Sequence, residues 1–152
     1  MKDLKPILEA HPFVRGLSQE HVDLLVGCAS NKRFHKGDYL GRAGKKADLF
    51  YFIREGTVAL EISGAQRGRL TIQTLHDGDA LGWSWLITPY RWHFDVRAIT
   101  PTRTISLDGP CLRGKCESDH ELGYEIMSRI AHMMEQRLTA TNLQLLDIYA
   151  QH

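Results

Sequence analysis

Apolar positions in the first thirty residues follow helical spacing. After Ser18, apolar residues recur at positions 22, 25, 26 and 29, three or four apart, which places them on one face of a helix. Asp3 and Ser18 each carry a short side-chain oxygen that can cap a helix N-terminus. Residues 1–30 are therefore predicted to form N-terminal helices, with the core residues Phe13 and Val14 between them.

The pattern changes to short apolar runs from residue 31 to residue 108. The runs lie at residues 49–53, 57–62, 70–75, 94–99 and 103–107, and turn-forming residues separate them. Glu55-Gly56 lies between the first two runs and predicts a hairpin turn, because glycine readily adopts a positive φ. Short strands at regular spacing with such turns predict a β-sandwich or barrel.

A short motif occurs twice within this β region. Residues 35–40 and 76–81 both have the form H-x-G-D-x-L, 41 positions apart. The repeat predicts a β-roll in which the same Gly-Asp turn leads into a short strand in each half. Coincidence is the alternative, because Gly-Asp turns are common.

The chain ends in a long stretch of helical character. Ser118 to Glu121 has the S-x-x-E form of a capping box. Neither proline nor glycine follows Gly123, so the predicted helix, residues 118–150, would be about 45 Å long. That is longer than a compact domain of this size needs.

Two apolar stripes run along this predicted helix. One steps by four and three residues, as in a coiled-coil seam, and comprises Met127, Ala131, Met134, Leu138, Thr141, Leu145 and Ile148. The other, Ile126, Ile130 and Met133, lies near the start. We expect one stripe to pack on the β-roll and the seam to form a homodimer interface. A helix that lies only on its own domain is the alternative.

Composition and charge limit the classes of partner that the protein is expected to bind. The 152 residues fit one domain, with 43% hydrophobic and 24% charged residues. A net charge of +1 provides no general attraction to DNA or acidic membranes. No apolar run approaches the roughly 18 residues of a membrane span, and the N-terminus lacks the apolar region of a signal peptide. We therefore expect a cytoplasmic protein without membrane partners.

Cysteine and histidine spacing favours neither a metal site nor an enzyme. Cys28, Cys111 and Cys116 are an odd number, which argues against a disulfide framework. Cys111, Cys116 and His120 fall short of the four ligands of structural zinc, so free thiols and no metal are expected. The eight histidines contain no H-x-H pair of the kind that a cupin-like metalloenzyme requires. No Ser/His/Asp grouping is visible, and we expect no catalysis.

The order of these elements resembles the cyclic nucleotide-binding domain of the Crp/Fnr (catabolite activator) superfamily. The stretch from Phe34 to Val58 is similar to the family pattern F-x-x-G-D-x-L…G…A-D-x-x-Y-x-I-x-x-G-x-V, and 78–82 resembles the start of its phosphate-binding cassette. The resemblance covers residues from about 10 to 150. It implies a mainly β fold, a double-stranded, jelly-roll-like β-roll with N-terminal helices and a long C-terminal helix.

Two cassette positions depart from the family pattern. The glycine that matches Gly82 is followed in the family by a glutamate for the ribose, and here by Trp83. The phosphate-binding arginine of the family lies six residues before the alanine that matches Ala98, which is the position of Trp92. Strand alternation points positions 92, 94, 96 and 98 inward. Arg91 would face outward unless an irregularity near position 89 turned it inward.

The residues carried over as tentative ligand contacts are Gly82, Trp83, Ser84, Trp85, Leu86, Arg91, Trp92, Arg97 and Ala98. Backbone N–H groups of 83–86 form a potential anion nest. Five aromatic residues between 83 and 94 allow two interpretations. Either the pocket is remodelled to stack a flat ligand, or the rings close it as core.

Crp/Fnr proteins carry a DNA-binding winged helix after the long helix. This chain stops at His152, and from Glu117 onward it has two basic and six acidic residues, so no DNA partner is expected. The sequence thus predicts a regulatory sensor module that binds a cyclic nucleotide or another small ligand and signals through its last helix to an unknown protein partner. The alternatives are an ordinary cyclic AMP- or cyclic GMP-binding protein that uses Arg91, and a structural dimer module with a closed pocket.

Overall fold

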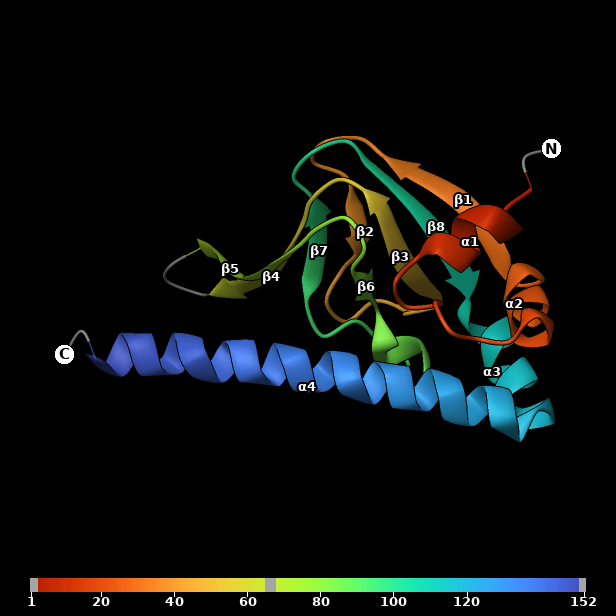
Figure 1. The fold of residues 1–152 in the computed structure, drawn as a ribbon. Coiled ribbons are helices and arrows are strands. Elements are labelled where there is room, and N and C mark those ends of the chain that lie inside the picture. The colour runs from red at the N-terminus through yellow and green to blue at the C-terminus, as the bar shows by residue number, and fades with distance from the viewer. Residues whose placement is uncertain (1–2, 65–67, 151–152) are drawn as a thin grey trace.

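The computed structural model describes residues 3–64 and 68–150. Helices flank a roll of strands, and one long helix runs along its base (Figure 1). The elements in chain order are α1 (Lys5–Ala10), α2 (Gln19–Val26), β1 (Ala29–Phe34), β2 (Tyr39–Gly41), β3 (Leu49–Glu55), β4 (Val58–Gly64), β5 (Gly68–Leu75), β6 (Ala80–Leu81), η1 (Trp83–Trp85), β7 (Asp95–Ala98), β8 (Thr102–Asp108), α3 (Gly109–Ser118) and α4 (His120–Ala150). Ser18 caps α2 as predicted, since its side chain accepts a hydrogen bond from the His21 N–H.

The strands of the described residues form two four-stranded sheets. One has the order β1-β8-β3-β6 and the other β2-β7-β4-β5, and all neighbours pair antiparallel. This confirms the predicted fold class. The division into one domain with boundaries at 30, 108 and 118 stays a prediction.

The hairpin predicted at Glu55-Gly56 is wrong. β3 and β4 belong to different sheets, and β4 pairs with β5 instead. Gly56 does adopt a positive φ of 122°, and its N–H donates to the Asp77 carboxylate at 2.8 Å. A Cβ at this position would stand 2.6 Å from the hydroxyl oxygen of Thr102. Gly56 is therefore the point where the chain crosses between the sheets.

The repeated H-x-G-D-x-L motif forms the same turn twice. In each copy the aspartate, Asp38 or Asp79, accepts a hydrogen bond of 2.8 Å from the backbone N–H of the histidine three residues earlier. The intervening glycines have φ values of 91° and 86°. The turns lead into β2 and β6, one in each sheet. The predicted relation between the two halves of the roll is confirmed.

β3 contributes to two cores through alternate side chains. Phe50 and Phe52 face a cluster shared with the flanking helices, where Val14 is buried and Phe13 packs against them as expected. Tyr51 and Ile53 face the cluster between the two sheets. Alternation with a period of two makes this division possible, and the cassette contributes Trp85 to the first cluster and Trp92 to the second.

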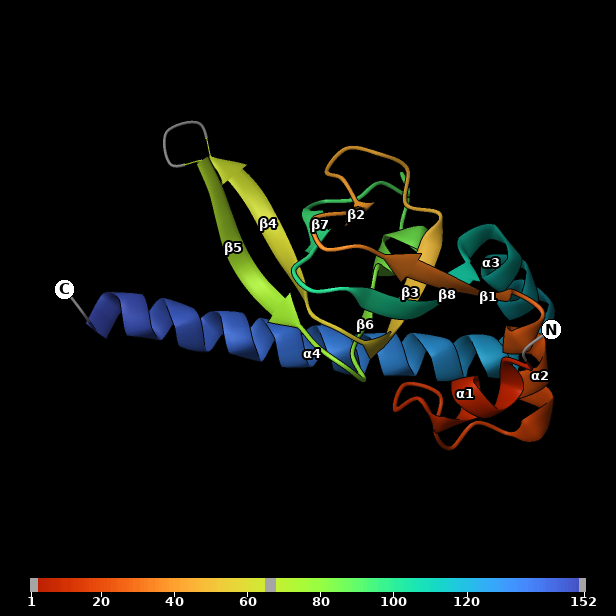
Figure 2. The same ribbon diagram turned by 90° about the horizontal axis from the view of Figure 1, so that it is seen from above.

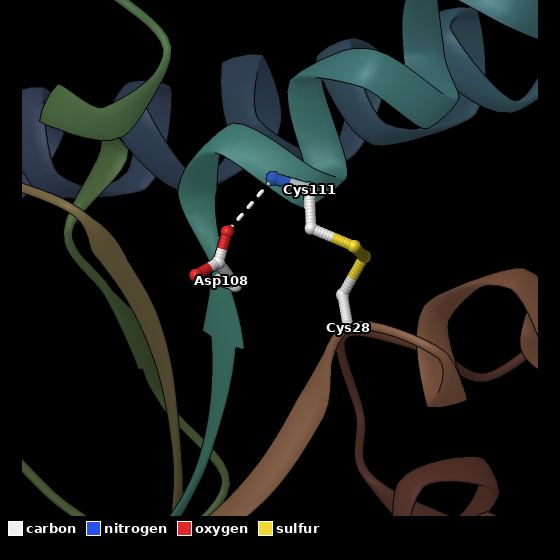
Figure 3. Close-up of a disulfide and its surroundings, with 3 residues drawn as sticks. All are labelled: Cys28, Asp108 and Cys111. Carbon is white, nitrogen blue, oxygen red and sulfur yellow. Dashed lines mark hydrogen bonds between the residues drawn. A yellow bond between two sulfur atoms is a disulfide. The ribbon is translucent and has the colours of Figure 1, made fainter.

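A disulfide joins Cys28 to Cys111, so the expectation of free thiols is wrong for these two residues (Figure 3). Their Cα atoms are 5.8 Å apart, an ordinary disulfide separation. The pairing of β1 with β8 brings the residues together, since Ala29 lies opposite Leu107. The Asp108 carboxylate accepts a hydrogen bond from the Cys111 N–H at 2.8 Å and caps α3 there. Cys116 is a free thiol.

The capping box predicted at Ser118 is also wrong. Ser118 is the last residue of α3, a helix that the sequence patterns did not indicate. The Asp119 carboxylate instead accepts a hydrogen bond of 3.1 Å from the Leu122 N–H at the start of α4. α4 has 31 residues. Its first half packs under the roll, and its second half extends past it (Figure 2).

Candidate functional site

The cassette begins where β6 ends. Gly82 has a φ of 98°, and the short helix η1 follows it. A Cβ at this position would stand 3.0 Å both from the Leu49 carbonyl oxygen and from the Trp92 ring. Glycine is therefore required here for its conformation and for its size. The Leu86 N–H, one of the expected anion-nest donors, donates to the Trp83 carbonyl oxygen at 3.0 Å.

In the segment that leads into β7, inward and outward side chains alternate as predicted. Trp92, Val96 and Ala98 are buried, and Phe94 is half-buried. Arg91 is exposed, and its guanidinium donates to the Gly44 carbonyl oxygen at 2.8 Å. The structure thus places Trp92 inward and Arg91 outward, and no inward turn of Arg91 occurs.

Trp92 fills the space between the sheets. Its ring stacks on Tyr51 with centroids 6.3 Å apart, and it covers the backbone at Gly41. The cavity left beside it has a volume of about 20 Å³. That is room for about one water molecule, whereas small-molecule sites typically enclose about 300–1,000 Å³. In this conformation Trp92 acts as core and the cavity is closed.

The aromatic residues of the cassette divide: Trp83, Trp92 and Phe94 line the small cavity, whereas Trp85 and Tyr90 lie elsewhere. Trp85 is fully buried and stacks on Phe50, with centroids 5.5 Å apart, in the core shared with the helices. Tyr90 lies under the Arg113 guanidinium at 4.0 Å. Trp83 is only half-buried and lines the small cavity together with the buried Ser84.

Arg97 is paired within the protein. Its guanidinium donates two hydrogen bonds of 3.0 Å to the two carboxylate oxygens of Glu61 on the neighbouring strand β4. Glu61 is buried, and these hydrogen bonds raise the pKa of Arg97. The Arg69 guanidinium lies 3.7 Å from the same carboxylate. The positive charge of Arg97 is therefore compensated by Glu61, and Arg97 does not line the cavity.

A cation that the sequence patterns did not single out reaches the cavity from α4. Arg137 is 9% exposed, and its guanidinium lies 5.0 Å from the Trp83 ring centroid. It also donates to the Ala80 carbonyl oxygen. Burial lowers the pKa of Arg137 to about 10, opposed by the charge of Asp79, so the side chain remains charged at neutral pH. Arg137 lies four residues after Met133 and so continues the stripe that packs on the roll. This spacing could have identified Arg137 from the sequence.

The two stripes of α4 divide as expected. Ile126, Ile130 and Met133 are buried against the roll. All seven seam residues are exposed: Met127, Ala131, Met134, Leu138, Thr141, Leu145 and Ile148. The dimer that this seam would form stays a prediction.

The described residues contain no group of three or more histidine, cysteine or acidic side chains arranged to hold a metal ion. Within the same part of the chain, no helix combines the length and the apolar character of a membrane span.

Comparison with known proteins agrees with this architecture. The profile of the cyclic nucleotide-binding domain matches residues 31–119. A cyclic nucleotide-binding protein from Geobacter metallireducens GS-15 superposes with a TM-score of 0.79 at 28% identity, over 88% of this chain and 97% of that one. The catabolite activator protein of Thermus thermophilus superposes with a TM-score of 0.71 at 19% identity, over 91% and 63%, a likeness of fold.

A curated relative from Rhodopseudomonas palustris, provisionally described as a potassium channel protein, is 24% identical over 140 residues. The match covers 92% of this chain but 33% of the relative, so the chain spans about a third of that protein's length. The profile match, the two-sheet roll and the helix beneath it agree with one another. The chain belongs to the cyclic nucleotide-binding domain family.

Proposed function

We propose that this chain is a regulatory module of the cyclic nucleotide-binding type whose pocket is closed by Trp92 and whose output passes through α4. The observation that carries the proposal is the inward Trp92, with a cavity of only about 20 Å³ beside it. At this position the family places the arginine that pairs with the cyclic phosphate. A ligand here would lack that charge-assisted partner, so we expect cyclic AMP to bind at least about a hundredfold more weakly than in the family pattern.

The contacts of Trp83 support a route from the cassette to the helix. Its ring lies beneath the Arg137 guanidinium, and Arg137 also holds the Ala80 carbonyl oxygen in β6. A ligand large enough to displace Trp83 would break the ring–guanidinium contact. The packing of α4 on the roll would then change. Ligand binding would in this way be transmitted to whatever contacts the free part of α4, without any catalytic step.

The exposed seam of α4 supports self-association as the output. Seven residues with coiled-coil spacing project from the side of the helix that does not pack on the roll. A second copy of the chain offers the same seam, so an isologous pairing would bury both. We propose a homodimer whose helix pairing depends on the state of the cassette.

The mapping of the cassette is tested by restoring the family residues. The double substitution Trp83→Glu and Trp92→Arg supplies the ribose and phosphate partners and removes two large rings. We expect calorimetry to detect little or no cyclic AMP binding to the native chain and measurable binding to the variant. Replacing a buried tryptophan also lowers stability, by several kcal/mol for truncation to alanine, so thermal unfolding of both proteins is measured alongside.

The control is Arg91→Ala. Because the Arg91 guanidinium is exposed and bonded to the Gly44 carbonyl, we expect no effect of this change on ligand binding. Tight cyclic AMP binding by the native chain, lost in Arg91→Ala, would contradict the mapping and assign the phosphate contact to Arg91.

A structural dimer module without any ligand is the second candidate, favoured by the same closed cavity. A thermal-shift screen with cyclic mononucleotides, cyclic dinucleotides and small aromatic metabolites separates the two. A concentration-dependent rise in melting temperature with any of these, abolished in Trp83→Ala, supports the sensor. No rise with any compound, together with an intact dimer, supports the structural module.

A further inference from the structure

A second, open hollow lies beside the closed cassette. This groove has a volume of about 560 Å³ and runs between one face of α4 and the segment that joins β5 to β6. Seen from above, the end of β5 crosses the line of α4 near the middle of the helix (Figure 2). Its polar walls comprise Gln73, Thr74, Asp79, His132, Gln136 and Arg137. Arg137 lines both this groove and the closed cavity.

Arg137 is a buried cation with unused donors. A guanidinium carries five N–H groups, and the single hydrogen bond that the Arg137 guanidinium makes within the described residues is to the Ala80 carbonyl oxygen. In the same part of the chain no carboxylate lies within 4.0 Å of it. The nearby carboxylate of Asp79 is engaged with the His76 N–H at 2.8 Å. The Arg137 guanidinium is 9% exposed and forms no ion pair within the described residues, so an anion in the groove would find donors that the protein leaves unused.

The other arginine of the groove, Arg129, is held by the protein through its Nη1, whereas its buried Nε has no hydrogen-bond partner among the described residues. Arg129 donates to the carbonyl oxygens of Phe13 at 2.7 Å and Arg15 at 2.8 Å, and it lies 3.7 Å from the Glu125 carboxylate. Arg129 thus ties the N-terminal segment to α4. The charge available to a bound molecule comes from Arg137, with His132 and Gln136 on the same side of the helix.

We propose that this groove binds a small molecule carrying an oxyanion group, a phosphate or a carboxylate, with the Arg137 guanidinium as its charge partner. The planar fork of arginine matches either group with two parallel hydrogen bonds. The groove has the size of a small-molecule site, and the amide and hydroxyl groups of Gln73, Thr74 and Gln136 can bind a polar remainder. Asp79 makes the groove unfavourable for a ligand with several negative charges. The groove shares Arg137 with the cassette cavity, but the proposal does not depend on the cassette mapping at Trp83 and Trp92.

The test is an NMR titration of the folded chain with inorganic phosphate and, separately, with acetate, at constant ionic strength. We expect saturable shifts of the Arg137 Nε–H and the Trp83 indole N–H at millimolar concentrations. The anion that binds more tightly identifies the favoured group. Arg137→Gln should weaken binding at least about tenfold, the loss of a charge-assisted hydrogen bond pair. Arg103→Gln, the same change at an exposed arginine of a different hollow, should leave binding unchanged.

Three results would overturn the proposal: no saturable shift with either anion, equal binding by Arg137→Gln, or equal weakening by Arg103→Gln. If Arg137→Gln does not fold, Arg137→Lys keeps the charge without the planar fork and should bind more weakly than the native chain. Equal binding by Arg137→Lys and the native chain would then count against the bidentate contact. Cyclic AMP binding by Trp83→Glu with Trp92→Arg is measured separately, so failure of one proposal leaves the other standing.

Discussion

The Trp92 ring occupies the space where a Cβ of residue 41 would stand. A side chain at Gly41 would overlap the fused ring atoms of the indole. Gly41 lies at the end of β2, where the register of its pairing with β7 shifts, and Trp92 lies in the segment that leads into β7. Gly41 therefore makes room for the ring that closes the cassette, and the two positions should be energetically coupled.

A double-mutant cycle at these positions tests that coupling. Gly41→Ala should destabilise the native chain, because the indole must move. Trp92→Ala should cost about 3–5 kcal/mol by leaving a cavity. In the Trp92→Ala background, Gly41→Ala should cost less, with a coupling energy of about 0.5–3 kcal/mol, measured by urea unfolding. The control is Gly114→Ala, where an added Cβ meets nothing within 4 Å. Equal costs of Gly41→Ala in both backgrounds would contradict the contact.

Local patterns predicted the features that depend on neighbouring residues in the sequence. The alternation of residues 91–98 placed Trp92 inward and Arg91 outward, as the structure has them. The two H-G-D turns were visible because a positive-φ glycine and an aspartate cap act within four residues. Each of these features follows from local geometry that the chain cannot easily avoid.

Features that depend on long-range pairing were missed. A glycine such as Gly56 predicts a turn, but not whether the strands on either side pair with each other or enter different sheets. The pairing of β3 with β8 determines that β3 and β4 enter different sheets. Cys28 and Cys111 are 83 positions apart and meet only through the β1–β8 register. Arg137 reaches the cassette because α4 packs under the roll, a contact that spans 57 positions to Ala80.

Thiol counting tests the Cys28–Cys111 bond. In denaturant without reductant, one thiol per chain should react, and with reductant three. The variant Cys28→Ser with Cys111→Ser should lose about 2–4 kcal/mol of stability, whereas Cys116→Ser, which breaks no disulfide, should lose much less. Three reactive thiols in unreduced protein would contradict the bond. Because disulfides are rare in reducing compartments, the count also bears on the predicted cytoplasmic location.

His11 should make the stability depend on pH. Its ring stacks on Phe52, its Nδ1 accepts from the Phe13 N–H, and its Nε2 lies 3.2 Å from the Ile53 carbonyl oxygen. Burial lowers the pKa of His11 below 6.5; the Ile53 carbonyl and Asp79 oppose this shift, and the charge of Arg15 adds to it. The unfolded chain therefore binds the proton more readily, and stability should fall as the pH drops below about 7.

The measurement is the melting temperature at pH 7 and pH 5. His11→Gln keeps an amide donor for the Ile53 carbonyl but cannot titrate, so its melting temperature should fall less between the two pH values. His93→Gln, at an exposed histidine, should behave like the native chain. An unchanged pH dependence in His11→Gln would exclude His11 as its source.

The last prediction concerns dimerisation through the exposed seam of α4. Leu138 is 61% exposed and lies near the middle of the seam, next to the buried Arg137 in the sequence. If the seam pairs with a second copy, Leu138→Glu places an unpaired charge in the interface, which is strongly unfavourable. We expect sedimentation to show a dimer for the native chain and a folded monomer for Leu138→Glu, with association at least about a hundredfold weaker.

The control is Thr139→Glu, one position off the seam on the same exposed turn, which should remain dimeric. A native chain that is already monomeric at micromolar concentration would remove the basis for the dimer, and equal dissociation by both variants would show that charge on the helix, not the seam, controls association.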